Sequence, residues 1–328
     1  MKKIFVAIMA LGALASCSKD ETVALNQQAI QFGNAFVDNS TRATDPSYSK
    51  NDIASFKVYG TIEGNNIFDG VTIQKTADYG SAWTQVGGQT QYWVDGADYV
   101  FVGIVDGDKE NVTTTTTDET TGLPTSISYT ADGATDLLCQ TVEMTAGANE
   151  DRLVAFSFTH LLSKVNFTVN NKSKDAAGYS FVVKNITFNG NTFGKYNVEN
   201  EEWGNFATGN AIIGNERTVT VGGADTKVKD IVVASGTTST ELATEVLFLP
   251  GTYTISFTVD ILYNGEVITS TNYPATGTYS HTLEQNHAYN FNVEVSVGNP
   301  IKFTVSKQPT WEDGNTTPTE NPTYVPVN

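Results

Sequence analysis

The chain has 328 residues, enough for two domains with hydrophobic cores, and 39% of its residues are hydrophobic while 17% are charged. These proportions are typical of globular proteins and exclude a chain that is disordered throughout. Gly (28), Phe (17) and Tyr (14) are frequent while Met (3) is rare, so we predict an all-β protein of strands and tight turns. The formal charge of −17 argues against nucleic acid as a partner, because phosphate backbones are also negative.

The first 16 residues have the pattern of a signal peptide. Lys2 and Lys3 precede an apolar run from Ile4 to Leu14, and the chain then reads Leu14-Ala15-Ser16-Cys17. This ending resembles the bacterial lipobox, which implies that Cys17 receives a diacylglyceryl group, becomes the N-terminus and carries a further acyl chain such as palmitate. The alternative is an ordinary secretory leader in which the cysteine occurs by chance. Loss of the two lysines would bring the formal charge to about −19.

The rest of the chain favours a lipid anchor over a membrane-spanning helix. No later stretch approaches the roughly 18 apolar residues of a membrane helix, so lipid on Cys17 is the predicted anchor in the outer membrane. Ser18-Lys19-Asp20-Glu21 resembles the charged signal that takes Bacteroidetes lipoproteins to the outer leaflet. Cys139 is the second of two cysteines, so a lipidated Cys17 leaves it without a disulfide partner. We expect the Cys139 thiol to be buried rather than reactive.

A short apolar segment near the N-terminus is followed by a candidate cleavage site. Ala29 to Val37 is apolar, and Asp38 to Pro46 is polar and rich in turn residues, so we expect it to be exposed. Arg42 is the only basic residue of this loop. Because proteases cut exposed flexible loops, maturation between Arg42 and Ala43 is physically reasonable, although an incidental loop arginine explains the same pattern.

The first half of the chain alternates between predicted strands and turns. Tyr99 to Val105 is nearly continuously apolar, which indicates a central strand covered on both faces. Asp106 to Gly122 is expected to be an exposed loop. Within it, Asp106 to Glu110 has carboxylates at alternate positions, as some calcium loops do, but it lacks the other EF-hand ligands and is interpreted as a turn. The other predicted strands are Ile53 to Ile62, Gly70 to Lys75, Gln91 to Val94 and Ser126 to Thr130.

The stretch from Leu153 to Asn170 changes the phase of its apolar pattern. Phe156 and Phe158 share one face, but after His160 the apolar positions are odd-numbered, as in Val165 and Phe167. Side chains with a period of two cannot change phase without a bulge or a bend. We therefore predict that this segment leaves one β-sandwich and enters a second. The alternative is one bulged strand inside a single large sandwich.

The second half contains the clearest hairpin. Residues Tyr253 to Tyr263 alternate strictly, and Asn264-Gly265 then supplies a two-residue turn that would set Ile261 opposite Ile268. The tail from Asn315 to Asn328 contains three prolines and is too rich in proline for an inner strand. The other predicted strands are Phe181 to Asn189, Asp230 to Ala234, Tyr289 to Val297 and Ile301 to Val305.

Several short stretches, in order, resemble one known family. They are Gln91-Tyr92-Trp93 running into Tyr99 to Gly103, Asp136-Leu137-Leu138, Phe156 to Val165, Phe248 to Tyr253, Asn286 to Phe291, and Pro300 to Phe303 through Trp311. With the lipobox, they identify the chain as similar to the fimbrillins of the Bacteroidales, the lipoprotein-derived pilins. The resemblance implies two tandem transthyretin-like β-sandwiches, which we assign to residues 17–150 and 151–312, followed by a tail at 313–328.

The resemblance also implies how such a subunit assembles and where. An arginine-specific protease would remove Cys17 to Arg42, including a strand around Ile30 to Val37, and a strand from the next fimbrial subunit would fill the vacated groove. The donor candidate is the C-terminal tail, whose large apolar residues are Tyr324, Val325 and Val327. The expected place is the cell outer membrane and the fimbrium, with adhesion to a host or bacterial surface receptor. An anchor subunit would keep its lipid.

Two other classes of function remain to be weighed. A monomeric surface lipoprotein could bind a glycan or host ligand through Trp83, Trp93, Trp203 or Trp311; of these, Trp203 is the best candidate for a loop tryptophan, while Trp93 and Trp311 are expected in the core. An enzyme is the weakest class. His160, His281 and His287 have no metal-ligand spacing, and no nucleotide or nucleophile motif is present, so no catalytic residue, metal or cofactor is predicted. We expect His160 to satisfy a buried hydrogen bond.

Overall fold

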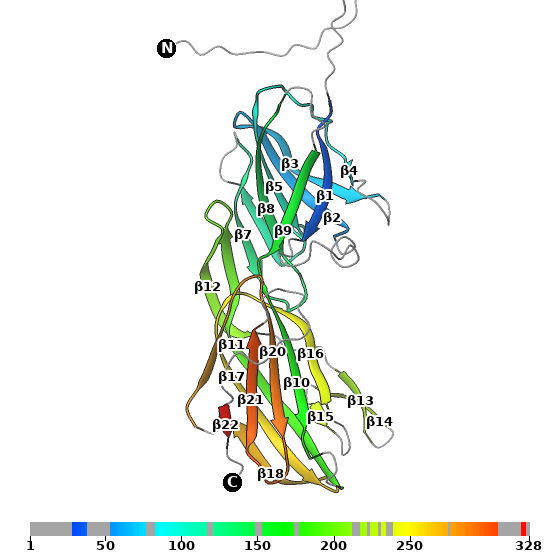
Figure 1. Ribbon diagram of the computed structural model, residues 1–328, viewed down its shortest axis with the longest axis vertical. Coiled ribbons are helices and arrows are strands. Elements are labelled where there is room, and N and C mark those ends of the chain that lie inside the picture. Colours follow the sequence, from blue (N-terminus) through cyan, green and yellow to red (C-terminus); the bar gives the residue numbers. More distant parts are fainter. Residues whose placement is uncertain are drawn as a thin grey trace, which may run out of the picture.

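The computed structural model describes an elongated molecule built from β-strands (Figure 1). It describes residues 28–37, 53–76, 83–116, 121–147, 153–173, 177–211, 217–221, 224–228, 231–233, 239–274, 276–307 and 323–325. Within these ranges every regular element is a strand, which confirms the all-β prediction. Among the same residues no helix is long and apolar enough to cross a membrane.

One end of the molecule is a seven-stranded sheet in the order β1-β9-β8-β5-β2-β3-β4. Its strands are β1 (Gln31–Val37), β2 (Ser55–Ile62), β3 (Asn65–Lys75), β4 (Trp83–Val86), β5 (Asp98–Val105), β8 (Leu138–Thr145) and β9 (Leu153–His160). β1 runs parallel to β9 and the other pairs are antiparallel. The edge strands β1 and β4 approach one another, so the sheet curls almost into a barrel. β5 lies at its centre and is buried along most of its length, as its apolar sequence predicts.

The other end consists of two sheets packed face to face. A five-stranded sheet has the order β16-β10-β20-β21-β22, and an eight-stranded sheet has the path β18-β17-β11-β7-β6, with β12 and β15 paired to β11 and β19 to β17. The five-stranded sheet contains β10 (Ser163–Asn171), β16 (Ser239–Phe248), β20 (Ala288–Val295), β21 (Ile301–Lys307) and β22 (Thr323–Val325). The eight-stranded sheet contains β6 (Val112–Thr116), β7 (Pro124–Thr130), β11 (Tyr179–Asn197), β12 (Glu202–Ala211), β15 (Ile231–Val233), β17 (Gly251–Tyr263), β18 (Glu266–Tyr273) and β19 (Tyr279–Leu283). A separate hairpin joins β13 (Arg217–Val221) to β14 (Ala224–Val228).

The phase change after His160 marks the passage between sheets. β9 ends at His160 in the seven-stranded sheet, and β10 begins at Ser163 in the five-stranded sheet. The side chains follow the backbone, because Phe156 and Phe158 pack in one hydrophobic cluster and Phe167 in another. These are two strands of two sheets and not one bulged strand.

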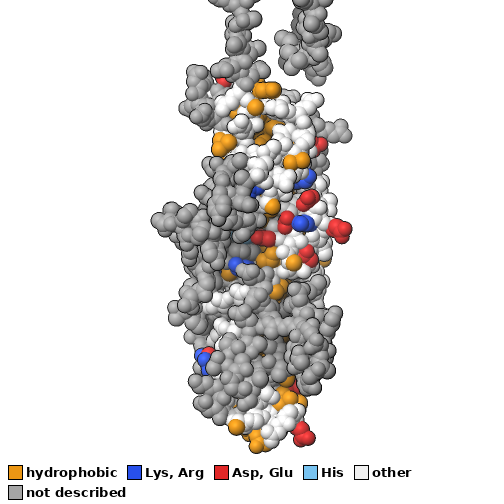
Figure 2. Space-filling model, turned by 90° about the vertical axis from the view of Figure 1, so that its right-hand side faces the viewer, with side chains coloured by type: hydrophobic (Ala, Val, Ile, Leu, Met, Phe, Trp, Pro, Cys, Tyr) orange, Lys and Arg blue, Asp and Glu red, His pale blue; other side chains and the backbone are white. Residues whose placement is uncertain are grey.

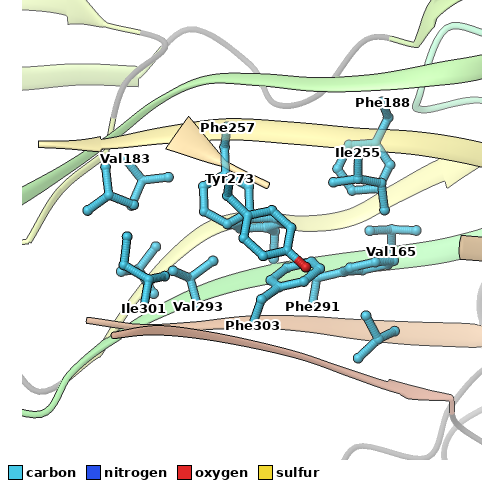
Figure 3. Packing of buried hydrophobic residues seen from close by; sticks show 14 of the residues in the cluster. Val165, Val183, Phe188, Ile255, Phe257, Tyr273, Phe291, Val293, Ile301 and Phe303 are labelled. Carbon is cyan, nitrogen blue, oxygen red and sulfur yellow. The ribbon is translucent and has the colours of Figure 1, made fainter. Parts of the chain in front are cut away.

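Three hydrophobic clusters fill the molecule from end to end. The largest lies between the five- and eight-stranded sheets, where the Phe303 ring is tilted against Phe257 and Tyr273 and stacks on Phe291 (Figure 3). Phe167 belongs to the same cluster and meets Phe257 edge-on. A second lies inside the seven-stranded sheet around Phe101 and Phe156. A third, which we call the waist cluster, includes Leu161 and joins residues from both halves of the sequence; its buried members are Val102, Ile104, Val112, Ile127, Tyr129, Leu137, Cys139, Leu161, Leu162, Tyr196, Val198, Leu247 and Leu249.

The predicted loop from Asp106 to Gly122 is wrong in part, because Val112–Thr116 forms β6. β6 pairs with β7, and β7 pairs with the last residues of β11, so a hairpin from the first half extends a sheet of the second half. The reason is that Val112 is buried in the waist cluster while the threonines after it suit a pleated, half-buried surface. The long strand β11 thereby ties the two halves of the sequence together.

The hairpin at Asn264-Gly265 forms as predicted, but with a different register. Both turn residues have positive φ, 51° and 88°, as a type I′ turn requires. Ile261 lies opposite Thr269 and not Ile268, because the register shifts between Ile261 and Leu262. The bulge leaves Ile268 exposed at the end of the molecule.

Candidate strand-exchange site at the first strand

The first described strand, β1, is an edge strand of the seven-stranded sheet, and the residues at its start also form backbone hydrogen bonds on the side away from the sheet. On one side β1 pairs with β9, with Phe32 opposite Val154. On the other side the Ile30 N–H donates to the Gln91 carbonyl at 2.8 Å, and the Trp93 N–H donates to the Gln28 carbonyl at 3.0 Å. The start of β1 therefore lies between β9 and a short segment at residues 91–93, which the sequence predicts as a strand and which forms a single bridge, Ala29 to Tyr92.

The inner face of β1 is part of the core. Ile30, Phe32 and Ala35 are each less than a tenth exposed. The Phe32 ring meets the Phe68 ring edge-on, with 5.4 Å between the ring centroids, and its centroid lies 6.4 Å from that of Phe156. A shift of register between Gly33 and Phe36 returns Ala35 to the inner face after the alternation of Ile30 and Phe32. Phe32 therefore fills a slot lined by aromatic rings.

Withdrawal of β1 would expose two features that can bind a strand: unpaired backbone groups and an apolar slot. The backbone groups of β9 and of residues 91–93 that pair with β1 would lose their partners, and the aromatic slot would lose Phe32. Unpaired backbone groups and open apolar surface are both costly, so another strand would be favoured in the same place. The arrangement can thus accept an extended segment by β-augmentation.

The predicted modification sites lie outside the described residues. Cys17 lies before residue 28, and Arg42 and Ala43 lie between β1, which ends at Val37, and the next described residue, Ile53. In sequence the candidate cleavage site is thus five residues beyond β1. A cut there would leave all of β1 on the released piece.

The C-terminal tail contributes an edge strand. β22 pairs antiparallel with β21, with Val325 opposite Ile301 and Thr323 opposite Phe303. An edge position agrees with the prediction from proline content, since an edge strand uses only one of its two hydrogen-bonding sides. Val327 lies outside the described residues. Tyr324 and Val325, two of the three apolar residues proposed for strand donation, lie in this edge strand.

The three tryptophans within the described residues, Trp83, Trp93 and Trp203, do not form the exposed platform that glycan stacking needs. Trp93 is 4% exposed, in agreement with the prediction, and Trp83 is half-buried against Phe56. The interpretation of Trp203 as a loop tryptophan is wrong: it lies in β12, and its indole N–H donates to the Leu161 carbonyl at 2.8 Å. It packs against the waist cluster because β12 folds back on β11. Trp311 is outside the described residues.

The polar residues singled out in the sequence have structural roles. His160 is 5% exposed, and its Nδ1 lies 2.9 Å from a carboxylate oxygen of Asp136, which confirms the predicted buried hydrogen bond. Asp106 and Lys109 form a turn in which the Lys109 N–H donates to the Asp106 carbonyl. Burial raises the pKa of the Asp106 carboxyl. Over the described part of the chain, no three His, Cys, Asp or Glu side chains are placed to hold a metal.

Cys139 is buried, as predicted, and we expect it to resist thiol reagents in the folded protein. It lies in the waist cluster, and its burial raises the pKa of the thiol to about 12, so the reactive thiolate is scarce at pH 8. Treatment with iodoacetamide at pH 8, followed by mass spectrometry, should leave Cys139 unmodified in buffer and label it fully in denaturant. Labelling at similar rates in both conditions would contradict the buried position.

The sequence pattern of the fimbrillin-like family matches residues 41–309, more than half of the chain. The chain belongs to the fimbrillin-like family. Its fold resembles that of a fimbrial protein from Bacteroides vulgatus, with a TM-score of 0.60 and 13% identity, over 87% of this chain and all of that one. The family is one of fimbrial proteins and is not enzymatic.

Two further solved structures are matched with lower TM-scores. One is the fimbrial anchor protein Mfa2 from Porphyromonas gingivalis, with a TM-score of 0.41 and 13% identity over 84% of this chain and 97% of that one. The other is a fimbrial assembly protein from Parabacteroides distasonis, with a TM-score of 0.39 and 12% identity over 91% of this chain and all of that one. No curated protein sequence matches this chain.

Proposed function

We propose that this fimbrillin-like protein is a structural subunit of a surface fimbrium that polymerises by strand exchange and supports adhesion. The observation that carries the proposal is β1: an edge strand with a buried inner face, five residues before a candidate arginine cleavage site. Its loss would open a groove between β9 and residues 91–93. A strand supplied by the next subunit would restore both the hydrogen bonds and the buried apolar surface.

In this proposal the chain matures in two steps. Lipid on Cys17 first holds the precursor in the outer membrane, because several acyl chains give stable anchoring where one does not. Cleavage between Arg42 and Ala43 then releases residues 17–42 with their lipid. The C-terminal tail at 313–328 is the proposed donor, and the two proposed transthyretin-like sandwiches are residues 17–150 and 151–312. Other fimbrial subunits are the partners that this mechanism requires.

The N-terminus of the mature protein tests the processing step. Mass spectrometry of the protein recovered from the surface of its native cells should find that the chain starts at Ala43. An Arg42→Lys variant should instead retain acylated Cys17, because an arginine-specific protease does not cut after lysine. An acylated Cys17 on essentially all wild-type copies would rule out processing and leave an anchor subunit or a monomeric lipoprotein.

A further inference from the structure

The two ends of the molecule carry exposed apolar side chains. At the groove end, beside the start of β1, Tyr92, Val94 and Leu153 are 47%, 51% and 40% exposed. At the hairpin end, Tyr263, Val267 and Ile268 are 45%, 56% and 54% exposed. Apolar side chains appear at both ends and also on the middle of the visible described surface, and most of the charged side chains lie around its middle, with an acidic side chain beside the apolar group at the lower end (Figure 2). Exposed apolar groups at opposite ends are a pattern expected of a contact between different copies.

The groove-end side chains surround the place where a donor strand would enter. Tyr92 is opposite Ala29, just before β1, and Leu153 is opposite Gln31, the first residue of β1. Trp93, between Tyr92 and Val94, is buried inside the sheet, so its two neighbours point outward. A subunit that docks on these residues would therefore lie over the mouth of the groove.

The direction of the strands specifies which end of a second copy docks there. β1 runs from the groove end toward the middle of the molecule, and β22 runs from the middle toward the hairpin end, so the two point the same way (Figure 1). A second copy placed in the same orientation beyond the groove end brings its own hairpin end to Tyr92. Its C-terminal strand would then point into the groove along the direction that β1 follows.

We propose that the hairpin end of one copy docks on the groove end of the next copy, with Tyr263, Val267 and Ile268 against Tyr92, Val94 and Leu153. The proposal deepens the proposed function and rests on it, since it names a second contact between the same two subunits. The contact is head-to-tail and uses different surfaces on the two copies, so it propagates into a filament. Each patch is small, but the donor strand raises the effective concentration of the two ends and makes a weak contact sufficient.

Engineered cysteines at the two ends test this docking. The full chain carrying Tyr92→Cys and Val267→Cys is expressed in its native cells in place of the natural copy, and surface fimbriae are oxidised. We expect a ladder of reducible cross-linked oligomers at a yield about tenfold above that of a Phe206→Cys and Val267→Cys control. Phe206 is a matched exposed residue, 41% exposed, on β12 and away from both ends. Cys139 is buried and common to both variants.

Electron microscopy of the same cells before oxidation shows whether fimbriae are present, and this distinguishes failure of the docking from failure of strand exchange. Fimbriae without a ladder above the control would overturn the docking and leave strand exchange standing. A reducible end-to-end dimer in cells without fimbriae would support the docking and contradict strand exchange. The absence of both fimbriae and cross-links would overturn both.

Discussion

A Phe32→Ala substitution is expected to destabilise the chain that retains β1 by about 3–5 kcal/mol, the usual cost of removing a buried phenylalanine ring. Phe32 is 4% exposed and meets Phe68, Phe101 and Phe156. Its loss leaves a cavity among rings that belong to β3, β5 and β9, strands that cannot close on it without disturbing the sheet. Denaturant unfolding of the uncleaved protein measures the change.

Gln31→Ala is the matched control for this substitution. Gln31 is the neighbouring residue on β1, but it is exposed, so its truncation should change the free energy of unfolding by no more than about 0.5 kcal/mol. A Phe32→Ala change as small as that of the control would show that β1 detaches before the sheet unfolds. In that case β1 would already be an exchangeable strand in the precursor.

The sequence predicts the strands better than it predicts their partners. Alternating residues identify β17 and β20, and the phase change after His160 identifies the passage between sheets. Side-chain periodicity depends on neighbouring residues alone, so it can be read along the chain. The predicted pairing of Ile261 was wrong because residues 253–263 alternate without a change of phase, so the pattern gives no sign of the register shift between Ile261 and Leu262.

Contacts between segments that are far apart in the sequence could not be predicted from it. The pairing of Ala29 with Tyr92 joins residues more than sixty positions apart, and nothing in either segment specifies the other. The same holds for Trp203, whose polar neighbours indicate a loop although its indole is held by Leu161 across the waist cluster. The candidate site was therefore predicted as a removable strand, without the segment at residues 91–93 that flanks it.

The largest effect is expected from the loss of β1 itself. A chain that begins at Ala43 lacks the inner-face residues Ile30, Phe32 and Ala35 and leaves the paired backbone groups of β9 without partners. Since each buried unsatisfied group costs about 1–3 kcal/mol, the free energy of unfolding should fall by on the order of 5 kcal/mol. Thermal unfolding of the Ala43 chain against the chain that retains β1 measures this loss.

A peptide with the sequence of residues 315–328 should restore much of that stability. A strand that binds only the folded state stabilises it by about 2.7 kcal/mol at a concentration of 100 times its Kd, so the unfolding midpoint should rise with peptide concentration. The control peptide carries Tyr324→Ser, Val325→Ser and Val327→Ser, which keep the backbone donors and acceptors but remove the large apolar side chains from both faces of the strand. The two peptides differ only if side-chain burial, and not backbone pairing alone, drives insertion.

A second peptide, covering residues 28–37, distinguishes two reasons why the tail peptide could fail: loss of the groove, and use of a different donor strand. It restores the native β1 contacts, so it should raise the midpoint of the Ala43 chain whenever the groove remains competent. Rescue by this peptide and not by the tail would exclude the tail as donor while leaving strand exchange in place. Failure of both peptides would mean that the sheet rearranges after β1 is lost, which would contradict assembly through this groove.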